Sequence, residues 1–323
     1  MRAPDFWNRN APLSRLAIAA LSPIGAIYNE TVRWKAAHAR PYRAPIPVLC
    51  VGNISAGGTG KTPIAVAIAE AIIARGKNPF FLSRGYGGRI KEPVVVSSKH
   101  GAADVGDEPL MLSRKAPTVV SGDRAAGAKV ATDRGADVIV MDDGHQNFSL
   151  AKDVSIVVVD AETGFGNNRV LPAGPLREAA EQGLARADAI ILTGDGNPEL
   201  PCFSGPVLRA HVAPAPDRDW RGQRVVAFAG IGRPEKFFRT AQLLGADLAE
   251  TIAFPDHHPF TANELERLKI KARDLNAQLL TTEKDYVRLR DSDHQGIAML
   301  PIRAVIEPAG QLESLLDRLL APR

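Results

Sequence analysis

Short apolar runs alternate with amphipathic segments from residue 46 to about residue 213. The apolar runs predict strands at 47–53, 79–83, 93–97, 117–121, 137–142, 154–160 and 188–193. The segments between them predict helices at 63–75, 108–115, 123–134 and 177–187. Strands that alternate with helices form a doubly wound α/β sheet, whose ligands collect at the carboxyl ends of the strands. The pattern therefore predicts a ligand-binding α/β domain over residues 46–213.

A second α/β unit follows a polar, proline-rich stretch at residues 213–221, which we interpret as a linker. Beyond it the pattern predicts strands at 224–229, 248–254, 277–281 and 297–303. It also predicts helices at 233–244, 261–275 and 308–320. We therefore expect a smaller α/β domain over residues 222–323, with a cleft between the two lobes.

The N-terminal region has an apolar run of a different kind, at residues 11–28. Arg15 and Pro23 interrupt this run, and it is too short to cross about 30 Å of hydrocarbon. No convincing cleavage site of a signal peptide follows it. The run predicts an amphipathic helix in the membrane interface, with Trp7 and Trp34 as aromatic anchors. A helix packed on the core is the other interpretation. We assign residues 1–45 to a membrane-associating helical segment.

Composition adds two constraints. A chain of 323 residues suggests about two domains. Its two cysteines, Cys50 and Cys202, match neither a disulfide framework nor a metal site, and this favours a reducing cytosolic setting. The net charge is +4, and much of the basic excess lies before residue 46. An anionic membrane surface or a phosphorylated substrate explains this bias. No dense basic run with interleaved aromatics is present, so we expect no nucleic-acid partner.

A glycine-rich turn joins the first strand of the 46–213 domain to its first helix. It reads Ser55-Ala56-Gly57-Gly58-Thr59-Gly60-Lys61-Thr62. The backbone N–H groups of such a loop wrap a polyphosphate, and the helix N-terminus adds a positive dipole. Lys61 would reach the β- and γ-phosphates, and the Thr62 hydroxyl would hold Mg²⁺. The strict pattern has glycine where Ser55 stands, so Gly57 and Gly58 must supply the backbone freedom. The segment predicts a nucleotide-phosphate site.

Carboxylates lie at the end of one predicted strand and before one predicted helix. The strand at 137–142 ends in Asp142 and Asp143, which would complete a Mg²⁺ shell with Thr62, directly or through water. Asp142 is the better candidate, Asp143 would tune or share the site, and a turn or helix cap is the other interpretation. Asp107 precedes a helix, where it either favours the helix dipole or accepts the proton of a substrate hydroxyl.

Histidines and arginines supply further candidates. His257 and His258 follow a strand of the second unit and fit a base or a partner that orients an aspartate, with a surface histidine as the alternative. Arg84 and Arg124 follow strands, where the planar guanidinium suits phosphate. The loop at residues 167–178 is long, polar and rich in glycine and proline, which favours a binding role. The segment 281–285 ends a strand and is interpreted as a helix cap.

The order of these motifs resembles the tetraacyldisaccharide 4′-kinase family of the Gram-negative lipid A pathway, over nearly the full chain. The resemblance depends on Val51-Gly52-Asn53, Gly57-Gly58-Thr59-Gly60-Lys61-Thr62-Pro63, Ser83-Arg84-Gly85-Tyr86-Gly87-Gly88, Gly106-Asp107-Glu108-Pro109, Asp142-Asp143-Gly144-His145-Gln146, Asn168-Arg169, Leu171-Pro172-Ala173-Gly174-Pro175-Leu176-Arg177-Glu178, Asp256-His257-His258 and Thr282-Glu283-Lys284-Asp285. It implies a fold of the P-loop NTPase type and, with ATP and Mg²⁺, transfer of the γ-phosphoryl group to the 4′-hydroxyl of a tetraacyl glucosamine disaccharide 1-phosphate, which gives lipid IVA.

The resemblance also implies roles for single residues. Asp107 and His257 become the acid–base pair, and Lys61 assists the transfer. Arg84, Arg124, Gln146, Arg177 and Glu178 become the candidates for substrate binding. The family pattern Asp-Asp-Gly-Phe-Gln-His departs here to Asp142-Asp143-Gly144-His145-Gln146-Asn147, so His145 and Asn147 inherit no role. The implied enzyme is peripheral, lies on the cytoplasmic face of the inner membrane, contacts lipid through the N-terminal helix, and is expected to be a monomer.

Two other classes are compatible with a phosphate loop. A membrane-associated ATPase switch often carries a lysine near the start of the loop, where this chain has Ser55 and Ala56. A GTPase needs a guanine motif, and in Thr282-Glu283-Lys284-Asp285 the lysine is displaced from its position there. A kinase of a soluble small molecule is the remaining alternative, since the N-terminal helix is the feature that points to lipid.

Overall fold

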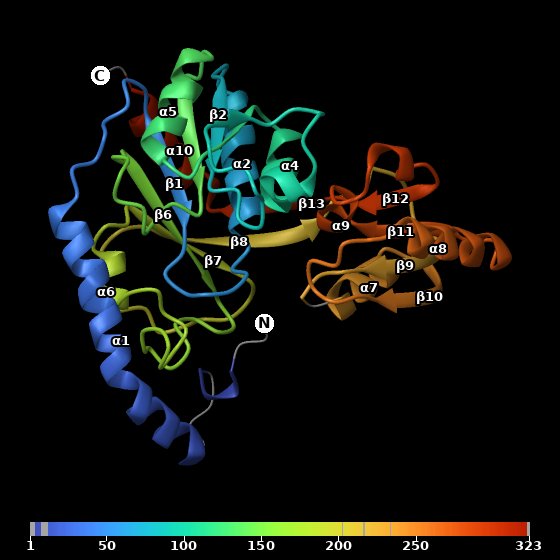
Figure 1. Ribbon diagram of the computed structural model, residues 1–323, viewed down its shortest axis with the longest axis horizontal. Coiled ribbons are helices and arrows are strands. Elements are labelled where there is room, and N and C mark those ends of the chain that lie inside the picture. Colours follow the sequence, from blue (N-terminus) through green and yellow to red (C-terminus); the bar gives the residue numbers. More distant parts are fainter. Residues whose placement is uncertain (1–3, 8–11, 202, 216, 233, 322–323) are drawn as a thin grey trace.

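The structure, a computed structural model, describes residues 4–7, 12–201, 203–215, 217–232 and 234–321. It has two lobes (Figure 1). The large lobe is built on a nine-stranded sheet of order β13-β8-β7-β6-β1-β5-β2-β4-β3, and the small lobe on a four-stranded sheet of order β10-β9-β11-β12. The protein is thus of the α/β class and has a large, mainly parallel sheet, which confirms the predicted doubly wound fold.

The strands of the large sheet are parallel except at its two edges, where β3 and β13 are antiparallel to their neighbours. Their bounds are β1 Val48–Gly52, β2 Pro79–Ser83, β3 Val94–Val95, β4 Thr118–Val120, β5 Val138–Asp142, β6 Val154–Asp160, β7 Ala189–Thr193, β8 Val207–Pro214 and β13 Ile302–Glu307. The helices of this lobe are α1 Pro12–His38, α2 Lys61–Ile73, α3 Ala102–Val105, α4 Asp107–Ser113, α5 Arg124–Asp133, α6 Ala180–Leu184 and α10 Ala309–Leu320, with the short helix η1 Asp5–Trp7 before α1.

Both faces of this sheet are buried, which explains why its strands read as continuous apolar runs. On one face, residues of α2 and α10 pack against alternate strand residues such as Leu49 and Val140. On the other face, residues of α5 and α6 pack against the intervening positions. Every residue of β1 and β5 is buried. The strand ends at Gly52 and Asp142 are therefore held by core packing, and they carry the candidate site.

The small lobe is a parallel sheet with one helix on each face. Its strands are β9 Arg224–Ala229, β10 Asp247–Ala253, β11 Gln278–Thr282 and β12 Ile297–Leu300. Its helices are α7 Pro234–Leu243, α8 Ala262–Asp274, α9 Glu283–Tyr286 and the short η2 Asp291–Asp293. Residues of α7 pack on one face of the sheet and residues of α8 on the other.

The predicted boundary of the second domain, residues 222–323, is wrong at its C-terminal end. The predicted strand 297–303 is two strands, since β12 ends at Leu300 and β13 begins at Ile302. β13 pairs with β8 in the large sheet, and four leucines of α10 enter the core of the large lobe. The predicted linker 213–221 likewise overlaps the end of β8, a strand that the sequence pattern missed. β8 is largely exposed along its second half, so its apolar signal is weak.

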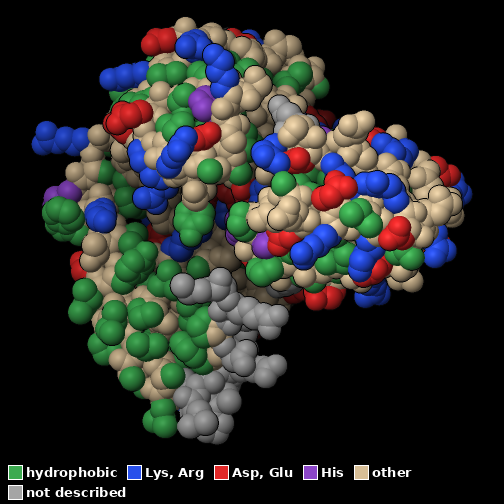
Figure 2. Space-filling model, turned by 45° about the vertical axis from the view of Figure 1, so that its right-hand side comes forward, with side chains coloured by type: hydrophobic (Ala, Val, Ile, Leu, Met, Phe, Trp, Pro, Cys, Tyr) green, Lys and Arg blue, Asp and Glu red, His purple; other side chains and the backbone are tan. Residues whose placement is uncertain are grey.

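The N-terminal helix α1 is longer than the predicted 11–28 segment, of which residue 11 lies outside the described residues. It runs along the outside of the large lobe, where the Asn29 side chain accepts the backbone N–H of Ala179 over 2.8 Å. Its large exposed apolar side chains are Leu16, Ile24, Ile27, Tyr28 and Trp34. Figure 2 shows hydrophobic side chains gathered at the lower left of the molecule, in the region of α1 in Figure 1. Among the described residues, no helix is long and apolar enough to cross a membrane.

Candidate active site

The phosphate loop connects β1 to α2 at the carboxyl edge of the large sheet. Its two halves have different surroundings. Ser55 pairs with Leu176 in an isolated bridge, and the Ala56 N–H donates to the Pro175 carbonyl over 2.7 Å. These two residues therefore tie the loop to the 167–178 segment. The prediction that the Ala56 amide faces a phosphate is wrong, because that amide already has a protein acceptor.

The second half of the loop is open. Gly57 (φ +125°) and Gly60 (φ +79°) have backbone conformations that favour glycine, and a Cβ at Gly57 or Gly58 would meet no atom within 4 Å. Within the described residues, the backbone N–H groups of residues 57–60 donate to no protein acceptor. Gly60 then leads directly into α2, whose N-terminus carries a positive partial charge. Unpaired amides at a helix N-terminus form a binding site for an anion such as a phosphate chain.

Lys61 and Arg177 converge on the carboxylate of Asp143. Lys61 Nζ lies 3.9 Å from Asp143 Oδ1, and Arg177 Nη1 donates to the same oxygen over 2.9 Å. Burial raises the pKa of Asp143, but Lys61 and Arg177 outweigh that effect and hold this pKa below its ordinary value. The structure thus brings Arg177, a predicted substrate ligand, to the edge of the phosphate loop, and gives Asp143 two cationic partners.

Asp142 has a different environment from its neighbour. Thr62 Oγ1 donates to Asp142 Oδ2 over 3.2 Å, while Asp142 Oδ1 is buried and has no hydrogen-bond partner. Burial, followed by the negative charge of Glu108, raises the pKa of Asp142 to about 7, although Lys61 and Thr62 oppose the shift. A buried carboxylate oxygen without a donor is stabilised by a proton, a water or a cation, and beside a phosphate loop a cation is the partner that this position favours.

The Asp142 carboxylate and the Thr62 hydroxyl fit Mg²⁺, which binds through one or two protein oxygens plus substrate phosphates and keeps several waters. The described residues contain no group of three histidine, cysteine or acidic side chains arranged for a metal, so a complete protein cage is not formed. Asp142 and Thr62 are better ligands than Asp143, since Lys61 and Arg177 already occupy the Asp143 carboxylate.

Close packing of two glycine-rich segments places Asp107. A Cβ at Gly106 would come within 2.4 Å of the Tyr86 carbonyl oxygen, and one at Gly88 within 2.6 Å of the Asp104 carbonyl oxygen. Only glycine permits this approach. The segment 85–88 therefore holds Gly106, and α4 begins at the next residue, Asp107. α4 packs against α2, the helix that follows the phosphate loop, so Asp107 and Glu108 begin a helix that neighbours this loop.

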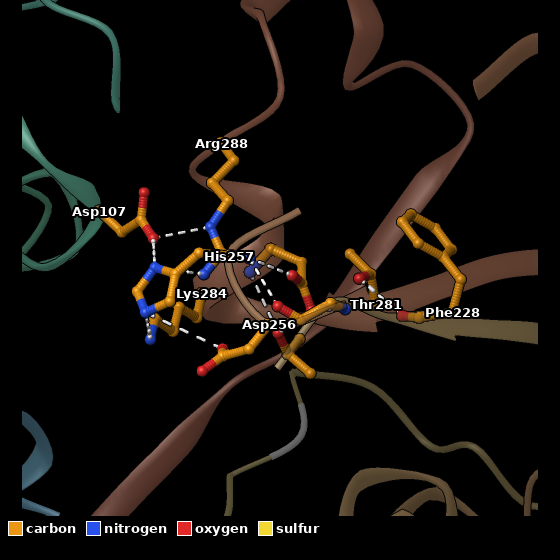
Figure 3. Close-up of polar contacts among 10 residues, drawn as sticks. Asp107, Phe228, Asp256, His257, Thr281, Lys284 and Arg288 are labelled. Atoms are coloured by element: carbon orange, nitrogen blue, oxygen red, sulfur yellow. Dashed lines mark hydrogen bonds and ion pairs between the residues drawn. The ribbon is translucent and has the colours of Figure 1, made fainter. Parts of the chain in front are cut away.

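Asp107 joins the two lobes (Figure 3). His257 Nδ1 lies 2.8 Å from Asp107 Oδ2, and Arg288 Nε donates to the same oxygen over 2.7 Å. Arg288 is also bonded to the Gly230 carbonyl and to Asp285 Oδ1, and its side chain is 4% exposed. The sequence predicted the first pair but missed Arg288. Its position six residues after the end of β11 carries no local signal.

The adjacent histidines have different roles. His258 Nε2 contacts Glu264 Oε1 at 3.0 Å, and its ring stacks on Phe254 with the centroids 4.8 Å apart. Glu264 also caps the N-terminus of α8 through Thr261. His258 is thus part of the small-lobe structure, and His257 is the partner of Asp107. The two rings diverge because His257 has a left-handed backbone, with φ of 58°.

Gln146 and Glu178, two predicted substrate ligands, form hydrogen bonds with other residues of the protein. Glu178 is 1% exposed and accepts two hydrogen bonds from Arg186 Nη2, of 2.8 and 2.7 Å. Gln146 Nε2 donates to Glu178 Oε1 and to the Asn53 carbonyl. For Glu178 the prediction of substrate contact is wrong, because its carboxylate is buried behind the loop with a bidentate partner. Gln146 connects this pair to the residue after β1.

The two predicted arginines, Arg84 and Arg124, differ in their exposure to solvent. Arg84 is exposed, whereas Arg124 is buried, donates to the Ser121 carbonyl, and leaves Nε without a partner. Burial, followed by the charge of Arg84, lowers the pKa of Arg124 to about 10, and Asp143 opposes the shift. Arg124 thus lies near the aspartate pair, and Arg84, whose charge acts on Arg124, is the one of the two arginines that is open to a substrate anion.

His145, which replaces the family's usual phenylalanine, is a buried structural residue. Its Nδ1 contacts Ser155 Oγ at 3.0 Å and its Nε2 contacts the Gly183 carbonyl at 2.9 Å. Burial, followed by the charge of Arg186, lowers the pKa of His145 to about 4. A Cβ at Gly52 would lie within 2.6 Å of the His145 Cβ, so the ring lies directly behind β1. The neutral ring therefore supports the strand that leads into the phosphate loop.

Comparisons with known proteins point to one family. The family model of tetraacyldisaccharide-1-P 4′-kinase matches residues 17–321. A tetraacyldisaccharide 4′-kinase of Paramagnetospirillum magneticum is 50% identical over 99% of both chains, and one of Parvibaculum lavamentivorans is 48% identical over 98% of this chain and 97% of its own. A crystal structure of LpxK from Aquifex aeolicus in complex with ATP matches with a TM-score of 0.79 and 27% identity, over 94% of this chain and 99% of that one.

Proposed function

The chain belongs to the tetraacyldisaccharide-1-P 4′-kinase family, and we propose that it transfers the γ-phosphoryl group of ATP to the 4′-hydroxyl of a tetraacyl glucosamine disaccharide 1-phosphate, which yields lipid IVA. As a member of this family it is a phosphotransferase with an alcohol acceptor. The observation that carries the detailed proposal is the position of Asp107. It stands at the start of α4, a helix that packs against α2 after the phosphate loop, and its carboxylate lies 2.8 Å from His257 Nδ1.

We propose that the phosphate loop holds the triphosphate through the N–H groups of residues 57–60 and the α2 N-terminus. Lys61 lies beside this loop, 3.9 Å from Asp143, and would neutralise the charge that develops on the transferred group. Thr62 and Asp142 would hold Mg²⁺, which supplies charge neutralisation at the phosphate oxygens when bound. This assignment gives the buried Asp142 Oδ1 the partner that the protein does not supply.

Asp107 would accept the proton of the 4′-hydroxyl as its oxygen attacks phosphorus. Its Oδ2 faces His257 and Arg288, while within the described residues its Oδ1 has no hydrogen bond. A base must lie within hydrogen-bond reach of the proton that it takes. Because Asp107 belongs to the large lobe and His257 to the small lobe, approach of the lobes completes this pair. Arg84 and Arg177 are the exposed or partly exposed cations suited to the substrate's anionic groups.

We further propose that the enzyme binds peripherally to the cytoplasmic face of the inner membrane through α1. The exposed apolar residues of this helix, with Leu16 at 71% and Ile27 at 70%, would enter the lipid interface. Trp34 near the end of α1 is a suitable anchor, whereas Trp7 donates its indole N–H to the Pro172 carbonyl over 3.2 Å and is tied to the protein. An acylated acceptor would then reach the site from the bilayer.

The direct test is incubation of the purified protein with radiolabelled ATP, Mg²⁺ and the tetraacyl disaccharide 1-phosphate, followed by chromatography of the lipid fraction. We expect label in a lipid with one additional phosphate, and no such product from Lys61→Met. A deacylated, water-soluble disaccharide 1-phosphate serves as the competing acceptor. Label on the soluble acceptor at equal or higher kcat/KM would favour a soluble-substrate kinase. Hydrolysis of ATP without labelled lipid would favour an ATPase switch.

A further inference from the structure

Lys284 lies on the far side of His257 from Asp107, in a motif to which the proposed chemistry assigns no role. Its Nζ lies 3.2 Å from His257 Nε2, and Figure 3 shows the imidazole between the two side chains. We propose that Lys284 is a positioning residue, which fixes the His257 tautomer and thereby orients Asp107 as the base. This inference rests on the proposed function, because Asp107 is a base only if the protein is a hydroxyl kinase.

The contacts of the two ring nitrogens determine the tautomer. A lysine ammonium has three donors and no acceptor, so His257 Nε2 must accept from Lys284 through its lone pair. The ring proton then resides on Nδ1, which points at Asp107 Oδ2 across 2.8 Å. A neutral imidazole donates through one nitrogen and accepts through the other. The geometry therefore gives a chain of donors that runs from Lys284 through His257 to Asp107.

Among the described residues, four charged side chains contact the ring. Asp107 belongs to α4, Asp256 precedes the histidine with Oδ1 3.9 Å from Nε2, and Lys284 and Arg288 come from the α9 region. Arg288 Nη2 lies 3.4 Å from Nδ1. Arginine can only donate, so as a hydrogen bond this longer contact would need a lone pair on Nδ1. The shorter contact of 2.8 Å with the Asp107 carboxylate, an acceptor, instead needs the proton on Nδ1, and we give it the greater weight.

Hydrogen bonds of neighbouring residues hold the backbone segment that carries Lys284. Thr282 accepts the Asp285 N–H at the start of α9, over 3.1 Å, which confirms the predicted helix cap. Asp285 is fully buried, accepts the Gly230 N–H, and pairs with Arg288. The His257 N–H donates to the Gly230 carbonyl over 3.0 Å. Gly230 thus connects the backbone of His257 to the buried pair of Asp285 and Arg288. Because Lys284 directly precedes Asp285, the same hydrogen bonds position Lys284 relative to the His257 ring.

The consequence concerns the two oxygens of Asp107. Nδ1–H of His257 and Nε–H of Arg288 both point at Oδ2, while Oδ1 receives no hydrogen bond from the described residues. With Oδ2 held by two donors, Oδ1 is the oxygen that faces a substrate hydroxyl. Loss of Lys284 frees the imidazole to adopt the other tautomer, in which Nδ1 would present a lone pair to the carboxylate. The lone pairs of Nδ1 and Oδ2 repel each other, and Asp107 would turn away.

The test compares Lys284→Met, which keeps the length of the side chain, with Lys284→Arg, which restores donors. Lys271→Met is the matched control, since Lys271 lies in the small lobe and pairs with Glu250. General-base catalysis contributes about 10² to 10⁴-fold, so loss of orientation should lower kcat by roughly 10- to 100-fold. We expect the KM values for ATP and the lipid to stay within about two-fold, partial recovery in Lys284→Arg, and no change in Lys271→Met.

A second readout is independent of turnover. The ¹⁵N spectrum of histidine-labelled protein reports the tautomer of each ring, and His257→Asn identifies the His257 signals. We expect the Nδ1–H form in the wild type and a mixture, or the Nε2–H form, in Lys284→Met. A wild type that fails to phosphorylate the lipid, with the tautomer still dependent on Lys284, would refute the proposed function alone.

Three results would overturn the positioning role. The first is an unchanged kcat in a folded Lys284→Met protein. The second is a rise in KM for ATP or lipid with unchanged kcat, because it would make Lys284 a ligand of a phosphate group. The third is a His257 tautomer that does not respond to the substitution. Circular dichroism and the melting temperature of each variant separate these results from a general loss of folding.

Discussion

His257 Nδ1 lies 2.8 Å from Asp107 Oδ2, although 150 positions separate the two residues in the chain. Asp107 begins a helix of the large lobe, and His257 follows a strand of the small lobe. The contact is reinforced by Arg288, which bonds both Asp107 and the buried Asp285. If this pair acts as the proposed base and its partner, its contact requires that the two lobes be correctly placed, so closure of the lobes on the substrate would control the chemistry.

Asp107→Asn should lower kcat by about 10² to 10⁴-fold with little change in the affinity for ATP. The amide has nearly the same shape as the carboxylate but is far too weak a base to accept the hydroxyl proton. Steady-state kinetics and equilibrium binding of a non-hydrolysable ATP analogue test this prediction. Asp133→Asn, an exposed aspartate of α5, is the control. A proportional loss of nucleotide binding would instead assign Asp107 to the nucleotide site.

Asp142→Asn and Asp143→Asn should differ in their dependence on Mg²⁺. Asp142 has a buried oxygen without a partner, whereas Asp143 is paired with Lys61 and Arg177. We expect Asp142→Asn to raise the Mg²⁺ concentration for half-maximal activity by roughly 10-fold or more, or to abolish activity. Asp143→Asn should alter chiefly the KM for ATP. A Mg²⁺ titration at saturating ATP distinguishes them, and equal shifts would contradict the assignment of Asp142 as the ligand.

Glu178→Gln should destabilise the protein rather than weaken substrate binding. The carboxylate is buried and accepts two hydrogen bonds from Arg186, so its neutral replacement should lower the free energy of unfolding by about 1–3 kcal/mol. Urea unfolding measures this loss, and the KM for lipid should remain near that of the wild type. A raised KM with unchanged stability would restore the original prediction that Glu178 contacts substrate.

Leu16→Ser combined with Ile27→Ser should weaken attachment to vesicles of anionic phospholipid. Both side chains are largely exposed on α1, and burial of one such side chain is worth about 1.5–3 kcal/mol, or roughly 10-fold or more in the partition coefficient. Co-sedimentation with the vesicles measures the effect. Leu243→Ser is the control, because this residue is 78% exposed on the small lobe. Equal recovery of the wild type and the α1 variant would refute anchoring through this face.

Gly106→Ala should impair transfer by displacing Asp107. Gly106 has a φ of +91°, and an added Cβ would meet the Tyr86 carbonyl at 2.4 Å, so the backbone must move. Gly135→Ala is the matched control, since Gly135 has a φ of +84° and a Cβ added there would meet no atom within 4 Å. Both variants should lose about 1 kcal/mol of stability from the backbone strain. Only Gly106→Ala should also lose activity, and equal activities would show that the close packing of 85–88 is not needed.

Local features of this protein were predictable from the sequence alone. The strands at 79–83 and 154–160 have the predicted bounds, and a helix follows the glycine-rich loop as predicted, although it spans Lys61–Ile73 rather than 63–75. Such features depend on hydrogen bonds, caps and burial within a few residues. The order of motifs likewise predicted the family, since these residue types serve the same chemistry wherever the strand ends bring them together.

Packing between distant segments decided the rest. Residues 302–320 return to the large sheet because β8 leaves an edge for β13 and the core of this lobe accepts the leucines of α10, neither of which is visible in local periodicity. The same holds for the side chains of Glu178 and Arg288, whose partners lie in other segments. The sequence by itself determined most of the local elements and, through the order of its motifs, most of the groups that we assign to the chemistry. Only the tertiary structure showed His257 in contact with Asp107, His258 bonded elsewhere and Arg288 beside the pair, because these contacts depend on how two lobes approach.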